Sequence, residues 1–317
     1  MDKKEKKQVS FFKMLGTAFI IYIIISLVSG LLITGKTIGI GFGNVALIEI
    51  EGVLTTQGTP QSIFSQQQLS SSDYVRLIDE ATKRKSIDAI VLYINSPGGG
   101  AVASYEIVEA IKRASEVKPV VAYIREVGAS GAYWAASASD YVVIQELGIT
   151  GSVGVVASYL EFSGLFEKYG VGYVRVTGGE YKDLGSPFRN LTDEESRLLQ
   201  AKIDEIHHIF TDDVIESRNL QERSEEDIRM IRSGIFFTAR EALSYGLVDE
   251  IAQFQRIEDL LKERYDIEKV EYSRQIRTGS QGIFGMNMEK ALSYVGLGIG
   301  ESISTKLNPD THIVVTT

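Results

Sequence analysis

The chain of 317 residues contains no cysteine and only three histidines. Without thiols it can form no disulfide bond, no thiolate zinc site and no cysteine nucleophile. His207 and His208 are neighbours in a polar helical pattern that lacks the H-E-x-x-H spacing of metallopeptidases, and His312 lies near the C-terminus. They offer no obvious base for a Ser-His-Asp triad and too few metal ligands, so we interpret them as exposed or interface residues. We expect no metal and no cofactor.

The sequence also lacks the positive charge of a nucleic-acid-binding protein. The net charge is −9, and residues 1–13 carry five lysines against two acidic residues, which leaves −12 on the remainder. An acidic body repels phosphate backbones, so we predict no nucleic-acid partner. The hydrophobic content of 44% is enough for one large or two modest folded domains.

A long hydrophobic run near the N-terminus predicts a membrane anchor. Residues 14–34 carry no charge and are long enough to cross a bilayer as a helix. The lysines before them place residues 1–13 in the cytoplasm and everything after Lys36 on the extracytoplasmic side. A cleaved signal peptide is the alternative, but the apolar run is too long and no small-x-small cleavage site follows it.

Residues 35–43 are rich in glycine and precede a strand pattern, so we interpret them as a flexible stalk. From residue 44 to about 265, strand and helix patterns alternate, which predicts an α/β fold with a mostly parallel sheet and right-handed crossovers. Residues 266–317 form a C-terminal extension whose role the sequence does not indicate. The expected strands are 44–50, 89–94, 119–124, 141–144 and 172–176, and the expected helices include 72–85, 102–114, 158–169 and 192–218.

Ser130 is the strongest candidate nucleophile. It lies in Gly128-Ala129-Ser130-Gly131, between a β-like run and a segment of small helix-forming residues. A serine at such a strand–turn–helix junction faces the unpaired N–H groups at the start of a helix, which suits acyl transfer. The alternative is a turn whose small residues only permit close packing of helix on sheet.

Lys182 is the candidate base, because a serine nucleophile still needs a group that accepts its proton. A lysine can serve when it is neutral, which burial and the absence of a nearby anion favour. Lys182 stands in a polar loop with several glycines, although Asp183 beside it is able to pair with it and keep it charged. An ordinary solvated lysine is the alternative interpretation.

Two glycine-rich turns complete the candidate site. The run Gly98-Gly99-Gly100 follows a strand and allows backbone N–H groups to converge on an anion, or it is simply a turn. Ser152 lies between two glycines and can orient the lysine amine, or it bonds its own backbone.

Four motifs follow one another along the chain. They are Ile94-Asn95-Ser96-Pro97-Gly98-Gly99-Gly100, Gly128-Ala129-Ser130-Gly131, Thr150-Gly151-Ser152-Val153-Gly154 and Gly179-Glu180-Tyr181-Lys182-Asp183-Leu184-Gly185-Ser186-Pro187. In this order they resemble signal peptide peptidase A, a family of membrane-anchored Ser-Lys peptidases. The first and second motifs are also similar to the Clp protease and crotonase superfamily, whereas the fourth motif is not shared with those relatives. The resemblance covers residues 45–253 and implies repeated ββα units of the Clp/crotonase type.

The resemblance implies a role for each matching residue. Ser130 is the implied nucleophile, Lys182 the general base and Ser152 the residue that holds the lysine amine, while the backbone N–H groups of Gly99 and Gly131 form the oxyanion hole. Members that resemble this single-domain form assemble into dome-shaped homo-oligomeric rings. Lys182 is therefore expected to act either on Ser130 of its own subunit or on Ser130 of a neighbouring subunit. Trp134 departs from the family pattern, where a smaller residue or tyrosine is expected.

The sequence thus predicts a membrane-anchored serine endopeptidase that cleaves hydrophobic peptides, including signal-peptide remnants, outside the cytoplasmic membrane. Two alternatives stay open. A crotonase-type acyl-CoA hydratase or isomerase shares the fold, although coenzyme A is cytoplasmic. A non-catalytic scaffold ring on the membrane is the other.

Overall fold

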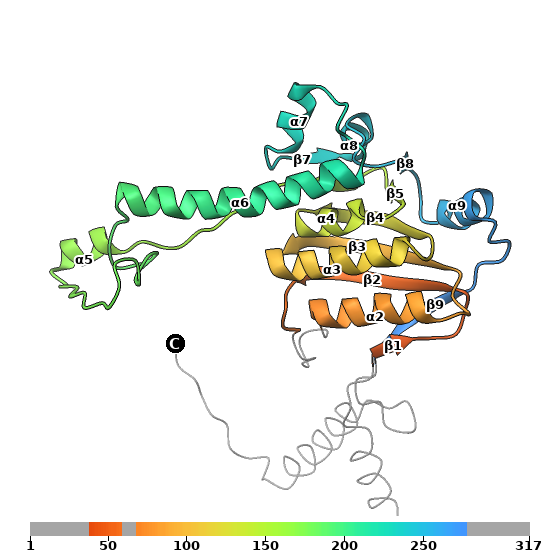
Figure 1. Ribbon diagram of the computed structural model, residues 1–317, viewed down its shortest axis with the longest axis horizontal. Helices are drawn as coiled ribbons and strands as arrows, with labels where there is room; N and C mark the ends of the chain where they lie inside the picture. The colour runs from red at the N-terminus through yellow and green to blue at the C-terminus, as the bar shows by residue number, and fades with distance from the viewer. Residues whose placement is uncertain (1–37, 59–67, 278–317) are drawn as a thin grey trace, which may run out of the picture. The chain divides into compact units, whose positions relative to one another are not determined.

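The computed structural model describes residues 38–58 and 68–277 of the chain. Its centre is a mixed α/β fold, as predicted, built on a sheet of order β1-β9-β2-β3-β4-β5-β8 (Figure 1). The pairings of β2, β3, β4, β5 and β8 with their neighbours are parallel. The strands of this order are β1 (Ile38–Ile40), β2 (Val45–Leu54), β3 (Ala89–Gly99), β4 (Val120–Ala129), β5 (Tyr141–Ile144), β8 (Glu250–Ile251) and β9 (Tyr272–Arg277).

The central strands are apolar because both of their faces are covered. The first six residues of β3 are almost continuously hydrophobic, and β2 and β4 flank them in register, with Ile48 opposite Leu92 and Leu92 opposite Ala122. All three of these side chains are fully buried. A parallel sheet between two layers requires such runs.

Three helices cover one face of the sheet: α2 (Ser71–Lys83), α3 (Ala101–Ser115) and α4 (Gly131–Ser137). The sequence marks the start of α2 with a capping box, in which Ser70 accepts from the Asp73 N–H and Asp73 accepts from the Ser70 N–H. The helices α3 and α4 follow β3 and β4 directly, whereas residues 55–70 separate α2 from β2, and each helix returns the chain to the next parallel strand. All three helices therefore begin at the same edge of the sheet.

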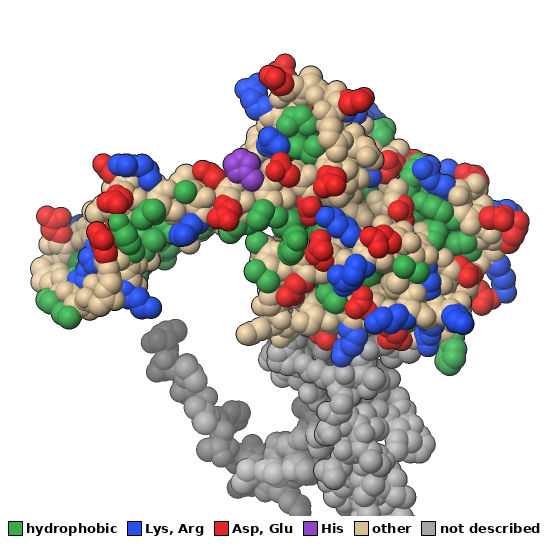
Figure 2. Space-filling model, in the orientation of Figure 1, with side chains coloured by type: hydrophobic (Ala, Val, Ile, Leu, Met, Phe, Trp, Pro, Cys, Tyr) green, Lys and Arg blue, Asp and Glu red, His purple; other side chains and the backbone are tan. Residues whose placement is uncertain are grey.

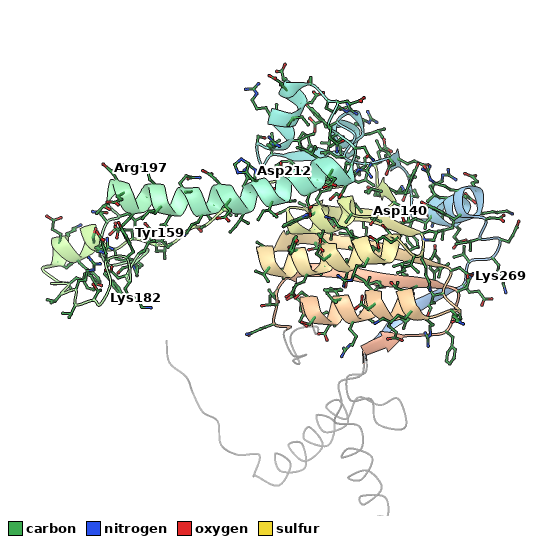
Figure 3. All side chains as sticks on the ribbon, viewed as in Figure 1. Asp140, Tyr159, Lys182, Arg197, Asp212 and Lys269 are labelled. Carbon is green, nitrogen blue, oxygen red and sulfur yellow. The ribbon has the colours of Figure 1, made fainter. Side chains whose placement is uncertain are left out.

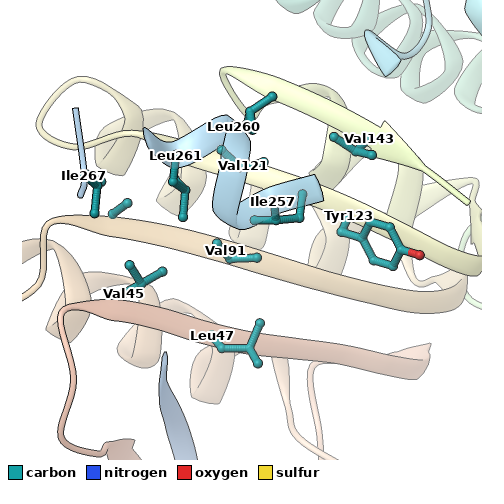
Figure 4. Close-up of a cluster of buried hydrophobic side chains, with 11 residues drawn as sticks. Val45, Leu47, Val91, Val121, Tyr123, Val143, Ile257, Leu260, Leu261 and Ile267 are labelled. Atoms are coloured by element: carbon teal, nitrogen blue, oxygen red, sulfur yellow. The ribbon is translucent and has the colours of Figure 1, made fainter. Parts of the chain in front are cut away.

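The other face is covered at one end by α9 (Arg256–Tyr265). Ile257, Leu260 and Leu261 of this helix pack on Val91, Val121 and Val143 of the sheet (Figure 4). The alternating side chains of the strands thus divide between α9 on this face and α2–α4 on the opposite face.

The end of β4 stays paired with β3 but has β6 (Ile149–Gly151) instead of β5 on its other side, and β6 in turn pairs antiparallel with β7 (Phe236–Thr238). Two short helices, α7 (Glu225–Ile231) and α8 (Ala239–Ser244), surround this second layer. The turn after β4 is therefore held from two sides, by the tip of β3 and by β6.

Between β6 and β7 the chain runs out to α5 (Ser163–Tyr169) and returns through the long helix α6 (Asp193–Ser217). We call residues 156–206 the arm; it contains α5 and the N-terminal half of α6, and it extends away from the sheet (Figure 1). The predicted helix 158–169 is present only as α5. The predicted strand 172–176 is wrong: these residues are exposed and pair with no strand in the described part of the chain. Their alternating pattern has no sheet edge within reach.

Several sequence expectations fall on residues outside the described part. The predicted membrane helix 14–34 is one of them, and no helix within 38–58 and 68–277 is long and apolar enough to span a bilayer. The sheet also draws on segments for which no strand was expected. Ile38–Ile40, within the predicted stalk, and Tyr272–Arg277, within the predicted C-terminal extension, form β1 and β9.

Candidate active site

Ser130 occupies the turn between β4 and α4 in an uncommon backbone conformation, with φ 52° and ψ −128°. A positive φ is costly for a residue with a side chain, and it persists only where the surroundings impose it. Here the Ser130 N–H donates to the Gly151 carbonyl at 2.8 Å, and the Ser130 carbonyl accepts from the Trp134 N–H at 2.9 Å. Both contacts fix the turn, and the Ser130 side chain stays partly exposed.

The tip of β3 lies directly against this turn. A Cβ added to Gly98, whose φ is +93°, would lie 2.7 Å from the Gly131 nitrogen and 2.9 Å from Ser130 Cβ. The Gly99 nitrogen lies 3.6 Å from the position of a Cβ on Gly131. The two amides predicted to form an oxyanion hole are therefore near each other and beside Ser130. Gly131 is the first residue of α4, so its N–H has no acceptor within the helix.

Ser152 lies on the other side of the same turn. Gly151, which accepts the Ser130 N–H, pairs with Ala129 at the end of β4, and Ser152 follows it directly. Ser152 also has a positive φ of 52°, and its N–H donates to the Ile235 carbonyl at 2.8 Å. The structure thus brings Ser130, Ser152, Gly99 and Gly131 together.

Two buried serines that support the turn went unassigned in the sequence analysis. Ser96 donates through Oγ to the Gly52 carbonyl at 2.5 Å and accepts from the Gly98 N–H at 3.1 Å, so it shapes the tip of β3. Ser104 on α3 lies so close to Gly131 that any Cβ there would collide with its side chain. The signal for Ser96 was its place within the first motif; nothing in the local pattern marked Ser104.

Lys182 is not part of this cluster within one chain. It lies at the outer end of the arm, where it is labelled in Figure 3. The Tyr181 hydroxyl beside it donates to Glu194 in the first turn of α6 at 2.8 Å, whereas Phe210, sixteen residues along α6, stacks on Trp134 of α4 at 4.6 Å. Sixteen residues of helix span about 24 Å. That length far exceeds the reach of a lysine side chain.

Trp134 joins the helix after Ser130 to the arm helix. Its indole N–H donates to Asp213 on α6 at 3.0 Å, and Asp213 also binds the Lys112 amine of α3 at 2.8 Å. Burial alone would lower the pKa of Lys112, but the hydrogen bond and charge of Asp213 together raise it above its usual value. The residue that departs from the family pattern is therefore an anchor for α6.

The loop around Lys182 is held by Arg189. Its guanidinium binds Asp183 at 2.9 and 3.0 Å and Glu195 at 2.8 and 2.6 Å. The Arg189 hydrogen bonds are the largest cause of the lowered pKa of Glu195, about 2, and they also lower the pKa of Asp183. A second arginine, Arg175, contacts Asp183 at 2.7 Å.

Two of the three histidines lie on α6. His207 Nε2 is 3.3 Å from the carbonyl oxygen of Val153, the residue after Ser152, and His208 is exposed. His312 lies outside the described residues. In residues 38–58 and 68–277, no group of three or more histidine, aspartate or glutamate side chains is arranged to hold a metal ion.

Comparison with known proteins identifies relatives of this chain. The model of peptidase family S49 matches residues 112–268. The protein "Putative protease MJ0651" of Methanocaldococcus jannaschii is 34% identical over 77% of this chain and 76% of its own length. The chloroplastic serine protease SPPA of Arabidopsis thaliana is 31% identical over 70% of this chain, which spans 31% of that longer protein.

Two further matches are more distant. Protease 4 of Haemophilus influenzae is 27% identical over 72% of this chain and 37% of its own length. Among solved structures, a membrane-bound stomatin-specific protease is 16% identical, with a TM-score of 0.47 over 73% of this chain and 96% of that one.

Proposed function

The chain belongs to peptidase family S49, which confirms the resemblance to signal peptide peptidase A, and from this premise we propose that it is a serine endopeptidase with a Ser130–Lys182 dyad. The observation that carries the proposal is the turn at Ser130, a strained serine beside two convergent backbone amides. The turn requires glycine at positions 98 and 131, because a side chain at either position would collide with neighbouring atoms. We assign the Clp/crotonase type of fold to this chain.

The reaction follows the chemistry of acyl transfer. Ser130 Oγ attacks the peptide carbonyl while the neutral Lys182 amine takes its proton, and the N–H groups of Gly99 and Gly131 receive the developing oxyanion. Lys182 then returns the proton to the leaving amine, and water hydrolyses the acyl-enzyme by the same sequence of proton transfers. Ser152 holds the lysine amine in place from the neighbouring turn.

We infer that the base comes from a second copy of the chain. The separation along α6 supports this, because the Lys182 loop lies at the far end of a helix anchored beside its own Ser130. The arm also exposes many large hydrophobic side chains, more than a solvated segment needs, and Figure 2 shows hydrophobic groups along it. They include Val156, Leu160, Tyr169, Val174, Val176 and Phe188.

The setting and substrates are part of the same proposal. Residues 14–34 anchor the chain in the cell membrane, the N-terminus is cytoplasmic, and the peptidase part lies on the extracytoplasmic side as a homo-oligomeric ring. Hydrophobic peptides such as signal-peptide remnants are released at that surface, and an arm that exposes apolar side chains would bind them.

The test is a complementation experiment with the full-length protein in detergent and a hydrophobic fluorogenic peptide. Ser130→Ala and Lys182→Ala alone should each abolish turnover, whereas Lys168→Ala, which removes another exposed lysine of the arm, should not. Co-assembly of the two inactive variants should restore activity, because some interfaces then combine an intact serine with an intact lysine.

Each contrary result points elsewhere. Activity in Lys182→Ala would reject lysine as the base and return attention to His207. If Ser130→Ala and Lys182→Ala are each inactive and their co-assembly restores no activity, the proposal that two copies of the chain share the dyad is rejected. Binding of acyl-CoA by a protein that cleaves no peptide would favour the crotonase alternative, and failure of Ser130 to react with an acylating probe would favour the scaffold.

A further inference from the structure

Asp183 is an anion placed directly beside the proposed base, yet other groups bind it. Arg189 donates to both of its carboxylate oxygens at 2.9 and 3.0 Å, and Arg175 contacts one of them at 2.7 Å. The Asp183 side chain is only 14% exposed. Lys182 is exposed, and within residues 38–58 and 68–277 its amine forms no ion pair. The carboxylate that follows Lys182 in the chain is thus bound by two arginines and forms no ion pair with the Lys182 amine in the described residues.

Arg189 is itself held in place by the start of α6. It donates twice to Glu195, which is buried and also accepts the Thr192 N–H at 2.9 Å as part of the helix capping box. Two carboxylates bound by one guanidinium give a planar, doubly forked arrangement that a lysine in its place would not reproduce. Arg189 therefore ties the Lys182 loop to a rigid helix and fixes the direction of Asp183.

We propose that Arg189, supported by Arg175, is a positioning residue that holds Asp183 away from the Lys182 amine so that the lysine can act as a neutral base. This inference rests on the proposed function, since only a lysine that must lose its proton needs protection from a neighbouring carboxylate. A carboxylate within about 4–6 Å of an ammonium group stabilises its charged form, so a released Asp183 would keep Lys182 protonated.

Replacement of Arg189 also releases Glu195 from an ion pair, so the Glu195 carboxylate differs between the wild type and the variants that lack Arg189. Arg189→Gln and the double variant lack this pair equally, and Glu195 keeps its bonds to Thr192 in both. Glu194 accepts the Tyr181 hydroxyl, Glu180 is exposed, and α5 contributes one acid and one base to this end of the arm. The titratable and charged groups of residues 161–197 other than Lys182 are Glu161, Glu167, Lys168, Tyr169, Tyr173, Arg175, Glu180, Tyr181, Asp183, Arg189, Asp193, Glu194, Glu195 and Arg197.

The test compares the pH dependence of kcat/KM for the full-length wild type, Arg189→Gln, Asp183→Asn and the double variant. We expect Arg189→Gln to move the acidic limb by about one pH unit toward alkaline pH, a roughly tenfold loss below the midpoint with little loss on the alkaline plateau. The double variant should return toward the wild-type midpoint because it lacks the Asp183 carboxylate, whereas Glu195 is released equally in the single and the double variant. The control is Arg197→Gln. Arg197 is an exposed arginine in the second turn of α6, so its replacement also removes one positive charge but should leave the pH profile unchanged.

The double variant separates positioning from folding. It has lost the same Arg189–Asp183 contact as the single variant, so a purely structural role would leave both equally impaired, with a lower plateau and an unshifted midpoint. That result overturns the inference while the proposed function stands, provided Ser130→Ala and Lys182→Ala are inactive. If either of those two variants retains activity, the proposed function fails and this inference fails with it.

Discussion

Replacement of Asp213 by alanine should loosen the attachment of α6 to the body of the protein. Asp213 is the point where three helices meet, because it accepts from Trp134 on α4 and from Lys112 on α3. Its side chain is 17% exposed. The adjacent Asp212 is a natural control: it is 65% exposed and makes one ion pair, with Arg232 at 2.8 Å.

The magnitude follows from the groups left without a partner. A buried indole N–H that loses its acceptor costs about 1–3 kcal/mol. The Lys112 side chain is 35% exposed, so water solvates its amine once the ion pair with Asp213 is lost. The loss of this ion pair therefore adds at most about 1 kcal/mol. We therefore expect Asp213→Ala to cost about 1–4 kcal/mol of local stability, and Asp212→Ala about 0–1 kcal/mol.

Hydrogen–deuterium exchange of the full-length protein measures this difference directly. At about 1.4 kcal/mol for each factor of ten, amides of residues 207–217 should exchange roughly 5- to 700-fold faster in Asp213→Ala, whereas β2 and β3 keep their protection. Equal acceleration in the Asp212 and Asp213 variants, or none in either, would refute the assignment of Trp134 and Asp213 as the anchor of α6.

Two further predictions concern the turn and the arm. Gly131→Ala should abolish peptide cleavage and destabilise the protein by about 1–3 kcal/mol, because the new methyl group collides with Ser104; Gly131→Ala with Ser104→Gly should recover part of the loss in a thermal melt. The Arg189 hydrogen bonds, and after them the Thr192 N–H, lower the pKa of Glu195 to about 2. The ionised Glu195 therefore stabilises the folded arm at pH values above about 4.3, the pKa of a glutamate in the unfolded chain. That stability is lost as the pH falls from about 4 toward 2, so pepsin should begin to cut residues 178–192 in this window, and already at pH 4 in Glu195→Gln; cleavage independent of pH and variant would contradict the linkage.

The core of the fold was predictable because its strands are buried on both faces. An apolar run such as 89–94 is typical of a central parallel strand when turn motifs and helical patterns alternate with it. Capping boxes mark the first residues of α2 and α6. The strands β1 and β9 were not expected, because β1 is an edge strand of only three residues and β9, which lies between β1 and β2, pairs with β2 over only three residues. The predicted strand 172–176 failed for the opposite reason: its pattern is strand-like, but a strand forms only where another edge accepts its hydrogen bonds.

The candidate site divides in the same way. The proximity of Ser130, Ser152, Gly99 and Gly131 follows from motifs at the ends of adjacent strands, which a parallel sheet brings to one edge. The distance of Lys182 could not be derived from its spacing, since it depends on the direction in which α6 leaves its anchor at Trp134. The roles of these residues in catalysis stay predictions for the experiments above.

Lys182 lies in the loop before α6, at the end of this helix that is far from the Trp134 anchor, and this position decides when the protein can act. If the base is supplied by a neighbour, as proposed, a newly made chain has a serine that no group of its own deprotonates, and it is harmless to the peptides around it. Hydrolysis then begins only where copies accumulate, and dilution stops it without an inhibitor or a propeptide. The length of α6 sets this latency, because it keeps the Lys182 loop away from the serine of the same chain.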